Sequence, residues 1–268
     1  MKKLILSIAI LATSKMIFAC DAIDDAAIDR IIENITPSIK KTSMDVNYVN
    51  FEYLPSICKS WPQRPGLDII VVPYAYGKKY LKADGNQSLG IAVAVVDRKR
   101  KKETMQLDER RVASIGKIYP YEVTIDTADY KAGNENFLFG VRVSLKRNDR
   151  PRSFSFYDKF MTLYDISQGT IRPVVNKLMM YNLSGVEDGM DMCPFSSSEL
   201  TTLISVGKQE TNGFADLIVQ AKRNLSSFKK TNSVCRQTDT RSSTKEYTMK
   251  FNGKDYDIPM ELSDGASL

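Results

Sequence analysis

The 268-residue sequence contains no histidine, and this absence decides most of the chemistry that its side chains can carry out. Without imidazole there is no Ser-His-Asp or Cys-His nucleophile, no His-ligated zinc centre and no acid–base side chain that titrates near neutral pH. Ser-x-x-Lys occurs seven times, as chance gives in a chain rich in serine and lysine, and its companion motifs are absent in the required order. No Gly-rich phosphate-binding loop is present either, so the sequence predicts no cofactor.

The carboxylates that could act without histidine are clustered at Glu187, Asp188 and Asp191, in a glycine-punctuated segment just before Cys193. Paired carboxylates are sufficient for glycoside hydrolysis, so the cluster raises the hypothesis of a His-free hydrolase acting on glycan or cell wall. A solvated loop and a calcium loop are the alternatives, although the D-x-D-x-D-G spacing of calcium loops is missing. We therefore assign no catalytic residue.

A group of tyrosines, Tyr74, Tyr76 and Tyr80, is the candidate binding surface. Strand alternation puts Tyr74 and Tyr76 on one face, and Tyr80 follows a glycine turn. Clustered tyrosines can bind a partner at low cost in conformational entropy, which would suit a protein or a glycan. The alternative is that these rings pack as cross-strand pairs inside the fold.

The sequence contains four cysteines: Cys20, Cys58, Cys193 and Cys235. They have no C-x-x-C spacing and no histidine to complete a site, so we expect structural disulfides and no metal. Glu199–Val206 and Phe214–Lys222 are typical of consecutive strands, and the open end of such a hairpin brings together the loops that carry Cys193 and Cys235. We expect these two cysteines to pair. Cys58 then pairs with Cys20 or remains a buried thiol.

Residues 1–19 have the pattern of an export signal: two lysines, the short apolar run Leu4–Ala12 and a cleavage pattern ending at Ala19. Cleavage there would make Cys20 the first mature residue and a candidate for lipidation, although Lys15 interrupts the apolar run. The chain is therefore expected in the periplasm, with membrane contact only through such an anchor.

Electrostatics give no indication of nucleic-acid binding. The net charge is +6, and removal of the leader with its three lysines leaves 35 basic and 32 acidic groups. A charge of +3 is too small for a nucleic-acid footprint. The one dense charge run, Arg98–Lys102, is interpreted as a solvated loop, with an anionic docking patch as the alternative.

The elements that would position these residues are mostly strands. Residues 21–36 have isoleucines at three- and four-residue spacing and predict one amphipathic helix. About eleven short apolar segments follow, at spacings of 8–15 residues and with no long helix between them. The predicted strands include Leu67–Ala75, Leu89–Val96, Tyr121–Ile125, Phe137–Leu145, Phe160–Ile166, Thr170–Val175, Lys177–Leu183 and a last hairpin, Tyr247–Ile258, around Asn252-Gly253. The pattern predicts an all-β antiparallel fold, a sandwich or a propeller-like domain with one N-terminal helix, as a single domain over 20–268.

Several motifs together resemble a set of uncharacterised exported bacterial proteins that place a G-[YF]-x-D-L-x-V strand before a final hairpin. The motifs are Cys58–Pro65, Phe139–Val143, Met161–Asp165, Glu187–Cys193, Gly213–Val219 and Tyr247–Tyr256. The resemblance implies an exported β-rich protein with structural cysteines, and it implies no activity.

These observations favour a non-enzymatic envelope protein that binds another macromolecule, of the inhibitor or immunity type. The expected partner is an envelope protein or a cell-wall component. A His-free hydrolase and a glycan-binding module are the alternatives. An acidic pair facing a deep cleft would favour the hydrolase, whereas a flat or protruding patch would favour the binding protein.

Overall fold

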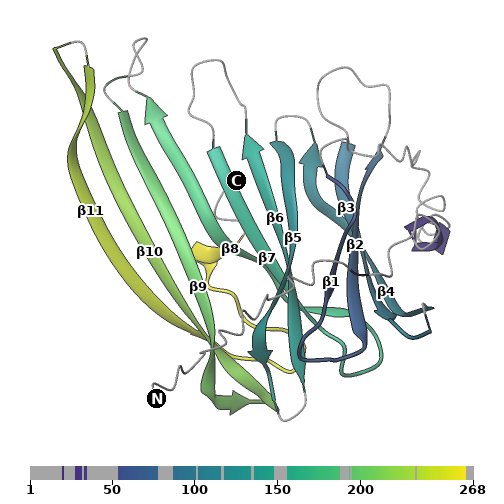
Figure 1. Ribbon diagram of the computed structural model, residues 1–268. Coiled ribbons are helices and arrows are strands. Elements are labelled where there is room, and N and C mark those ends of the chain that lie inside the picture. The colour runs from purple at the N-terminus through teal and green to yellow at the C-terminus, as the bar shows by residue number, and fades with distance from the viewer. Residues whose placement is uncertain are drawn as a thin grey trace, which may run out of the picture.

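The computed structural model describes residues 20, 28–31, 33–34, 54–77, 87–100, 102–115, 118–133, 136–147, 156–187, 193, 195–232 and 234–263. Within them the chain forms a four-stranded and a seven-stranded sheet that share one hydrophobic core (Figure 1). Every strand pair is antiparallel. The predicted all-β sandwich is confirmed, and the propeller-like alternative is not the arrangement found.

Strand neighbours in each sheet follow the order of the sequence. The four-stranded sheet consists of β1 (Ile57–Ser60), β2 (Leu67–Gly77), β3 (Gln87–Asp97) and β4 (Lys102–Ile115). The seven-stranded sheet consists of β5 (Ile118–Lys131), β6 (Phe137–Arg147), β7 (Phe156–Asp165), β8 (Arg172–Glu187), β9 (Phe195–Thr211), β10 (Phe214–Thr231) and β11 (Val234–Met249). A short 3₁₀ helix, η1 (Met260–Leu262), follows the last strand.

The central strands of the four-stranded sheet, β2 and β3, are buried on both faces, which explains their continuous apolar runs. Ile69 and Val71 of β2 pack in the core between the sheets, whereas Ile70 and Val72 pack on the opposite face. All four are at most 3% exposed. A strand covered on both sides has no reason to alternate apolar and polar residues.

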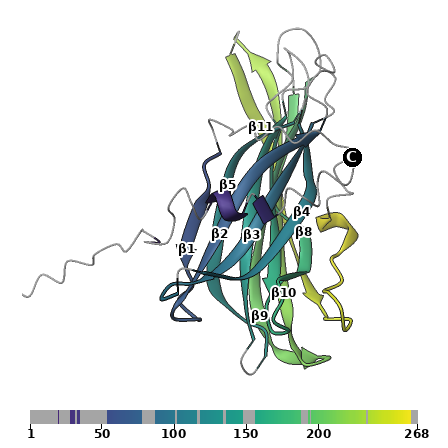
Figure 2. The same cartoon turned by 90° about the vertical axis from the view of Figure 1, so that its right-hand side faces the viewer.

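The N-terminal helical segment, residues 28–31 and 33–34, covers that opposite face and lies across β2 and β3 (Figure 2). Ile31 is fully buried there and belongs to the same apolar cluster as Ala92 and Ala94, whose small side chains allow a helix to approach closely. Gln106 Nε2 of β4 donates a hydrogen bond to the Ile31 carbonyl at 2.9 Å. The predicted helix is confirmed over these residues, and the rest of 21–36 lies outside the described residues.

Aromatic rings connect the two sheets at the centre of the core. Trp61, which follows β1, packs edge-on against Phe139 of β6 at 5.1 Å between centroids. Phe139 in turn stacks on Tyr164 of β7 at 5.2 Å. At the sheet edge, Lys59 Nζ donates a hydrogen bond to the Ile125 carbonyl of β5 at 3.1 Å. These contacts fix how the sheets face each other.

We call the face of the seven-stranded sheet that packs on the four-stranded sheet the inner face, and the opposite one the outer face. Strand register identifies one inner row: Leu145, Asp158, Asn182, Leu200, Arg223 and Ser243. Leu145 lies against Ile91 and Glu109 of the four-stranded sheet, which assigns the whole row to the inner face. The adjacent row, one residue away on every strand, therefore lies on the outer face.

The C-terminal segment covers the part of the inner face that the four-stranded sheet does not reach. Tyr256 donates two hydrogen bonds, from its amide to the Val174 carbonyl and from its hydroxyl to the Ala215 carbonyl, each at 2.7 Å. Phe251 stacks on Phe214 at 4.1 Å between centroids. Together these contacts complete the core over β8–β10.

The sequence patterns missed β1 and β4, and they missed β11 up to Tyr247. Nearly every residue of β11 is exposed, so the strand carries no apolar period that would reveal it. The predicted loop Arg98–Lys102 is a turn at residues 98–100, and Lys102 already begins β4. Arg98 is not only solvated, because its guanidinium forms a 2.5 Å ion pair with the fully buried Asp68.

Two predicted boundaries were also wrong. Thr170–Val175 and Lys177–Leu183 belong to one strand, β8, because Lys177 adopts a positive φ of 56° that bends the strand without ending it. Tyr247–Ile258 is not a hairpin of two strands. Its first residues end β11, and only a single bridge, Phe251 to Tyr256, closes the Asn252-Gly253 turn within the described chain.

All four cysteines form disulfides. Cys193 pairs with Cys235, as predicted, with Cα atoms 5.9 Å apart, and Cys20 pairs with Cys58 at 5.8 Å. A sulfur atom in a disulfide cannot also carry a lipid, so lipidation of Cys20 is incompatible with this structure. The predicted leader, 1–19, lies outside the described residues.

Truncation of Ile31 tests the role of the helical segment. Ile31→Ala should lower the free energy of unfolding by about 2–4 kcal/mol, because it leaves a cavity against a fully buried sheet face. Urea unfolding measures the change, with exposed Asp29→Ala as the control that stays within about 0.5 kcal/mol. A loss below this control range for Ile31→Ala would contradict the packing described.

Non-reducing peptide mapping of the mature protein tests the covalent frame. The expected cross-linked peptides contain Cys20 with Cys58 and Cys193 with Cys235, and the mass of the Cys20 peptide should include no acyl groups. A Cys58–Cys193 or Cys58–Cys235 cross-link would contradict the topology, and a lipidated Cys20 peptide would contradict the first disulfide.

Candidate binding surface

The predicted tyrosine surface is not exposed at the one tyrosine whose side chain is described. Tyr74 is 1% exposed and lies with Ile70 and Val72 on the face covered by the helical segment. Its ring packs directly over Gly90, where no side chain would fit, and its hydroxyl donates a hydrogen bond to Asp108. Tyr74 is therefore a core residue. The side chain of Tyr76 and all of Tyr80 lie outside the described residues.

Of the acidic cluster, only the backbone of Glu187 belongs to the described part of the chain. The backbone of Glu187 ends β8, where it pairs with Phe195. The side chain of Glu187, together with Asp188 and Asp191, lies outside the described residues. The carboxylate hypothesis thus stays a prediction.

Among the described residues, one group of potential metal ligands comes together: Cys20, Cys58 and Asp68. Both sulfurs are bonded to each other, and the Asp68 carboxylate accepts hydrogen bonds from the Arg98 guanidinium. Since a metal needs the thiolate form of cysteine, this group acts as a structural anchor. In the described part of the chain, no helix is long and apolar enough to cross a membrane.

A different set of tyrosines, one exposed and two half-buried, comes from three strands of the seven-stranded sheet. Tyr121 of β5 is 44% exposed and packs edge-on against Tyr157 of β7 at 6.1 Å between centroids. Tyr181 of β8 is next to them. Lys146 of β6 lies with its Nζ 5.7 Å from the Tyr157 ring centroid, within range of a cation–π contact. We call Tyr121, Lys146, Tyr157 and Tyr181 the tyrosine row.

Strand register explains why these residues share the outer face. Lys146 is opposite Tyr157, and Tyr157 is opposite Leu183, in the row next to the inner one. Tyr181, two residues from Leu183, points to the same side. Tyr121 reaches them through a bulge, because the register shifts by one residue between Pro120 and Glu122. Bulges re-aim side chains in this way.

Polar side chains continue the outer face on both sides of the tyrosine row. Tyr181 donates a hydrogen bond to Glu199 of β9 at 3.2 Å, and Glu199 also accepts one from Asn224 of β10. Burial and the Glu199 carboxylate raise the pKa of Tyr181, and the phenols of Tyr121 and Tyr157 act in the same direction. The tyrosine therefore remains a neutral hydrogen-bonding group at physiological pH.

The charged groups next to the tyrosine row on the outer face are paired. The Lys159 ammonium lies 3.2 Å from Glu122, which also accepts a hydrogen bond from Ser144 at 3.0 Å. These two hydrogen bonds lower the pKa of Glu122. A carboxylate stabilised in its ionised form is a poor general acid, so this pair contributes charge and no proton transfer.

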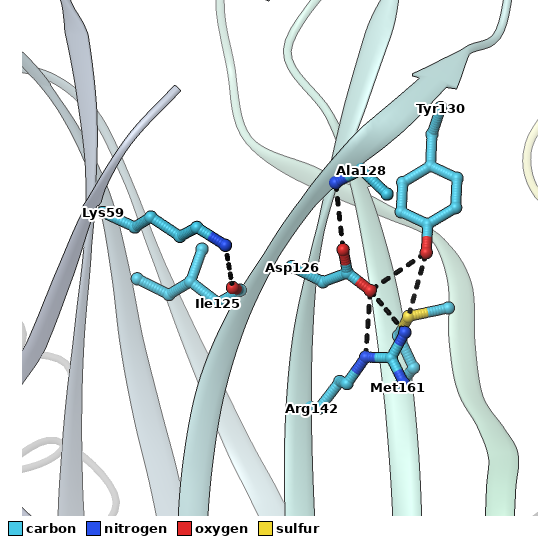
Figure 3. Close-up of polar contacts among 7 residues, drawn as sticks. All are labelled: Lys59, Ile125, Asp126, Ala128, Tyr130, Arg142 and Met161. Carbon is cyan, nitrogen blue, oxygen red and sulfur yellow. Dashed lines mark hydrogen bonds and ion pairs between the residues drawn. The ribbon is translucent and has the colours of Figure 1, made fainter. Parts of the chain in front are cut away.

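Asp126 is a second paired carboxylate, shown in Figure 3. It accepts hydrogen bonds from the Ala128 amide at 2.9 Å, the Tyr130 hydroxyl at 3.0 Å and both Nε and Nη2 of Arg142. Burial raises the pKa of Asp126, but these donors outweigh it and leave the pKa below its ordinary value. Burial and Asp126 raise the pKa of Tyr130 to about 12. The cluster joins β5 to β6 and commits the Asp126 carboxylate to hydrogen bonds within the fold.

The carboxylate that is driven toward its neutral form is half-buried and lines a small internal cavity. Burial raises the pKa of Glu109 in β4, against the opposing effects of a 2.8 Å hydrogen bond from Tyr164 and the nearby Lys177. The adjoining cavity, between Ile91 and Phe160, holds about 10 Å³, the space of one water molecule. No substrate could enter there.

Comparison with protein-family models, with curated protein sequences and with solved structures found no match to this chain. The resemblance to exported bacterial proteins therefore stays a prediction. No sequence pattern links Tyr121, Tyr157 and Tyr181. In the sequence, Tyr121 even alternates with Val123 and Ile125, which would have placed it in the core without the bulge.

The half-buried Glu109 makes a pH test possible. Its native pKa lies above the unfolded value of about 4.3, so as pH rises past that value its ionisation favours the unfolded state. Glu109→Gln keeps an acceptor for Tyr164 and cannot ionise. The variant should therefore gain stability relative to the wild type as pH increases from 4 to 7.

Chemical unfolding at several pH values measures this difference, with the exposed Glu246→Gln as a matched control. The control should differ from the wild type by a nearly constant amount over the same range. A pH-independent difference for Glu109→Gln would show that Glu109 ionises as readily in the native state as in the unfolded chain.

Proposed function

We propose that this chain is an exported, non-enzymatic envelope protein that binds another protein through the tyrosine row. The observation that carries the proposal is the gathering of three tyrosines and Lys146 from β5–β8 on an exposed sheet face. The anchors on this face are held in place by strand pairing, so little order has to be gained on binding.

Tyrosine suits this task because it combines a large apolar ring, a polar hydroxyl and only two side-chain torsions. Residues that dominate protein–protein binding are enriched in tyrosine and usually lie at the centre of a polar rim. Here Glu122 and Lys159 lie on one side of the tyrosine row and Glu199 and Asn224 on the other. The arrangement therefore has both an aromatic centre and a polar rim. This supports a protein partner with a mixed apolar and hydrogen-bonding surface.

The hydrolase alternative receives less support. Glycoside hydrolysis needs two carboxyl groups, with one of them protonated, on either side of the scissile bond. Among the described carboxylates, Glu122 and Asp126 are held ionised by basic partners, and the half-buried Glu109 accepts a hydrogen bond from Tyr164 beside a cavity too small for a sugar. The cluster at Glu187, Asp188 and Asp191 remains the one to test if hydrolysis is ever detected.

Two disulfides are typical of an oxidising, extracytoplasmic environment. Together with the leader pattern of residues 1–19, they support export to the periplasm. Because Cys20 is bonded to Cys58, we propose a mature protein without a lipid anchor.

Capture from envelope extract tests the proposal with three forms of the mature protein: wild type, the double variant Tyr121→Ala/Tyr157→Ala, and Leu203→Ala. Leu203 is the matched control, since it is a 63% exposed apolar residue on the outer face of β9. A protein partner should be retained by the wild type and the control and lost with the double variant.

The captured protein is then purified and titrated. The double variant should bind at least about tenfold more weakly, as expected for the loss of two aromatic anchors, while Leu203→Ala stays within about twofold. Equal capture by all three forms would contradict the proposed site, and retention of polysaccharide alone would favour the glycan-binding alternative.

A further inference from the structure

A second, separate feature is a hollow on the inner face of the seven-stranded sheet. It has a volume of about 560 Å³ and is formed by β8, β9, β10 and β11. Six serines, one glycine, one leucine, one aspartate and one arginine line it. Its size is in the range of small-molecule sites, and most of its lining residues carry a hydroxyl group.

Strand register explains the position of the hollow. Ser184, Ser198, Leu225 and Arg241 form one row across the four strands, two residues beyond the inner row that contains Leu200. Closer to η1 the same face is apolar and covered by the C-terminal segment. The composition of the inner face thus changes from apolar to hydroxyl-rich where that cover ends.

The hollow is held in shape from one end. Phe195 of β9 stacks on Phe228 of β10 at 4.1 Å between centroids, and the Cys193–Cys235 disulfide ties the start of β9 to β11. These links fix the strand ends next to Ser196 of the lining. A preformed site loses less entropy when it binds a ligand.

The charges in the lining balance. Arg241 Nε donates to Asp239 at 3.1 Å, so the one basic and the one acidic lining residue form an ion pair. From the neighbouring position, Arg223 Nη1 donates to the Ser198 hydroxyl at 3.2 Å. The lining itself therefore offers hydroxyls and a neutral ion pair, and the Arg223 guanidinium at its edge is held by the Ser198 hydroxyl.

From this lining we infer a carbohydrate-binding site, and we propose that the hollow binds a neutral oligosaccharide. Four of the six lining serines lie on the inner-face rows, and their hydroxyls can each donate and accept a hydrogen bond, as the hydroxyls of a sugar require. The Asp239–Arg241 pair adds both functions. Leu225, 48% exposed, offers the only apolar lining side chain among the described residues, enough for one face of a sugar ring. A peptide with large apolar side chains would find too little to bury.

The site is independent of the tyrosine row, which lies on the other face of the sheet. It goes beyond the proposed function by giving the protein a glycan ligand in addition to its protein partner. The chemistry is binding alone, because the described lining residues hold one carboxylate and no lysine that could activate a serine.

Calorimetric titration of the mature protein tests the site. The probes are neutral tetrasaccharides of glucose and of N-acetylglucosamine, and a sulfated tetrasaccharide serves as the anionic comparison. We expect at least one neutral probe to bind at micromolar to millimolar concentration, with little change between 0.15 and 0.5 M salt because no net charge is involved.

Two variants block the site in different ways. Ser227→Phe should fill the hollow and weaken binding by more than about tenfold, and Arg241→Leu, which removes a donor without adding bulk, should weaken it by about five- to tenfold. Ser205→Phe is the matched control for the first, as an exposed serine of β9 outside the lining, and Arg236→Leu for the second. Tyr121→Ala/Tyr157→Ala should bind sugar like the wild type.

Four results would overturn the proposal. One is that no neutral probe binds at millimolar concentration. Another is that neutral sugar binds equally to Ser227→Phe and Arg241→Leu, which places the sugar elsewhere. The third is that the sulfated probe alone binds in a salt-sensitive manner, which identifies an anion site. Loss of sugar binding in the double tyrosine variant alone would move the glycan to the tyrosine row and leave the hollow without a ligand.

Discussion

The architecture follows from a mismatch in width, because a four-stranded sheet cannot cover a seven-stranded one. Exposed apolar sheet surface is costly in water, so the remaining inner face must be covered or be polar. The chain does both. Tyr256, Phe251 and Leu262 of the C-terminal segment cover the part nearest the sandwich, and the part beyond is built from serines. The hollow lies where the cover ends.

The outer face is subject to a different constraint. No described element packs on the tyrosine row, so its side chains face water or a partner. Antiparallel pairing holds Lys146, Tyr157 and Tyr181 at fixed spacing, and the bulge at Tyr121 adds a ring from the edge strand. The sheet thus presents rigid aromatic groups on one side and hydroxyls on the other. If both proposed ligands bind, these two faces join a protein to a glycan.

Buried charges in this fold are structural. Asp68 is fully buried and paired with Arg98. Asp126 accepts hydrogen bonds from four donor groups. Removing one partner from such pairs leaves an uncompensated charge, which costs several kcal/mol, on the order of 3–5. Glu109 is different, since burial favours its neutral form. In this chain without histidine, these carboxylates stabilise strand pairing and packing. We assign none of the described carboxylates to catalysis.

The sequence by itself determined the all-β class, the helix that covers one sheet and the Cys193–Cys235 pairing, because apolar periods and hairpin proximity are local properties. It could not reveal β11, whose two exposed faces remove any period, nor the burial of Tyr74, which depends on a helix from far along the chain. The tyrosine row and the hollow were decided by tertiary structure alone. Both join residues from several strands, and a single bulge reverses the side on which a residue such as Tyr121 lies.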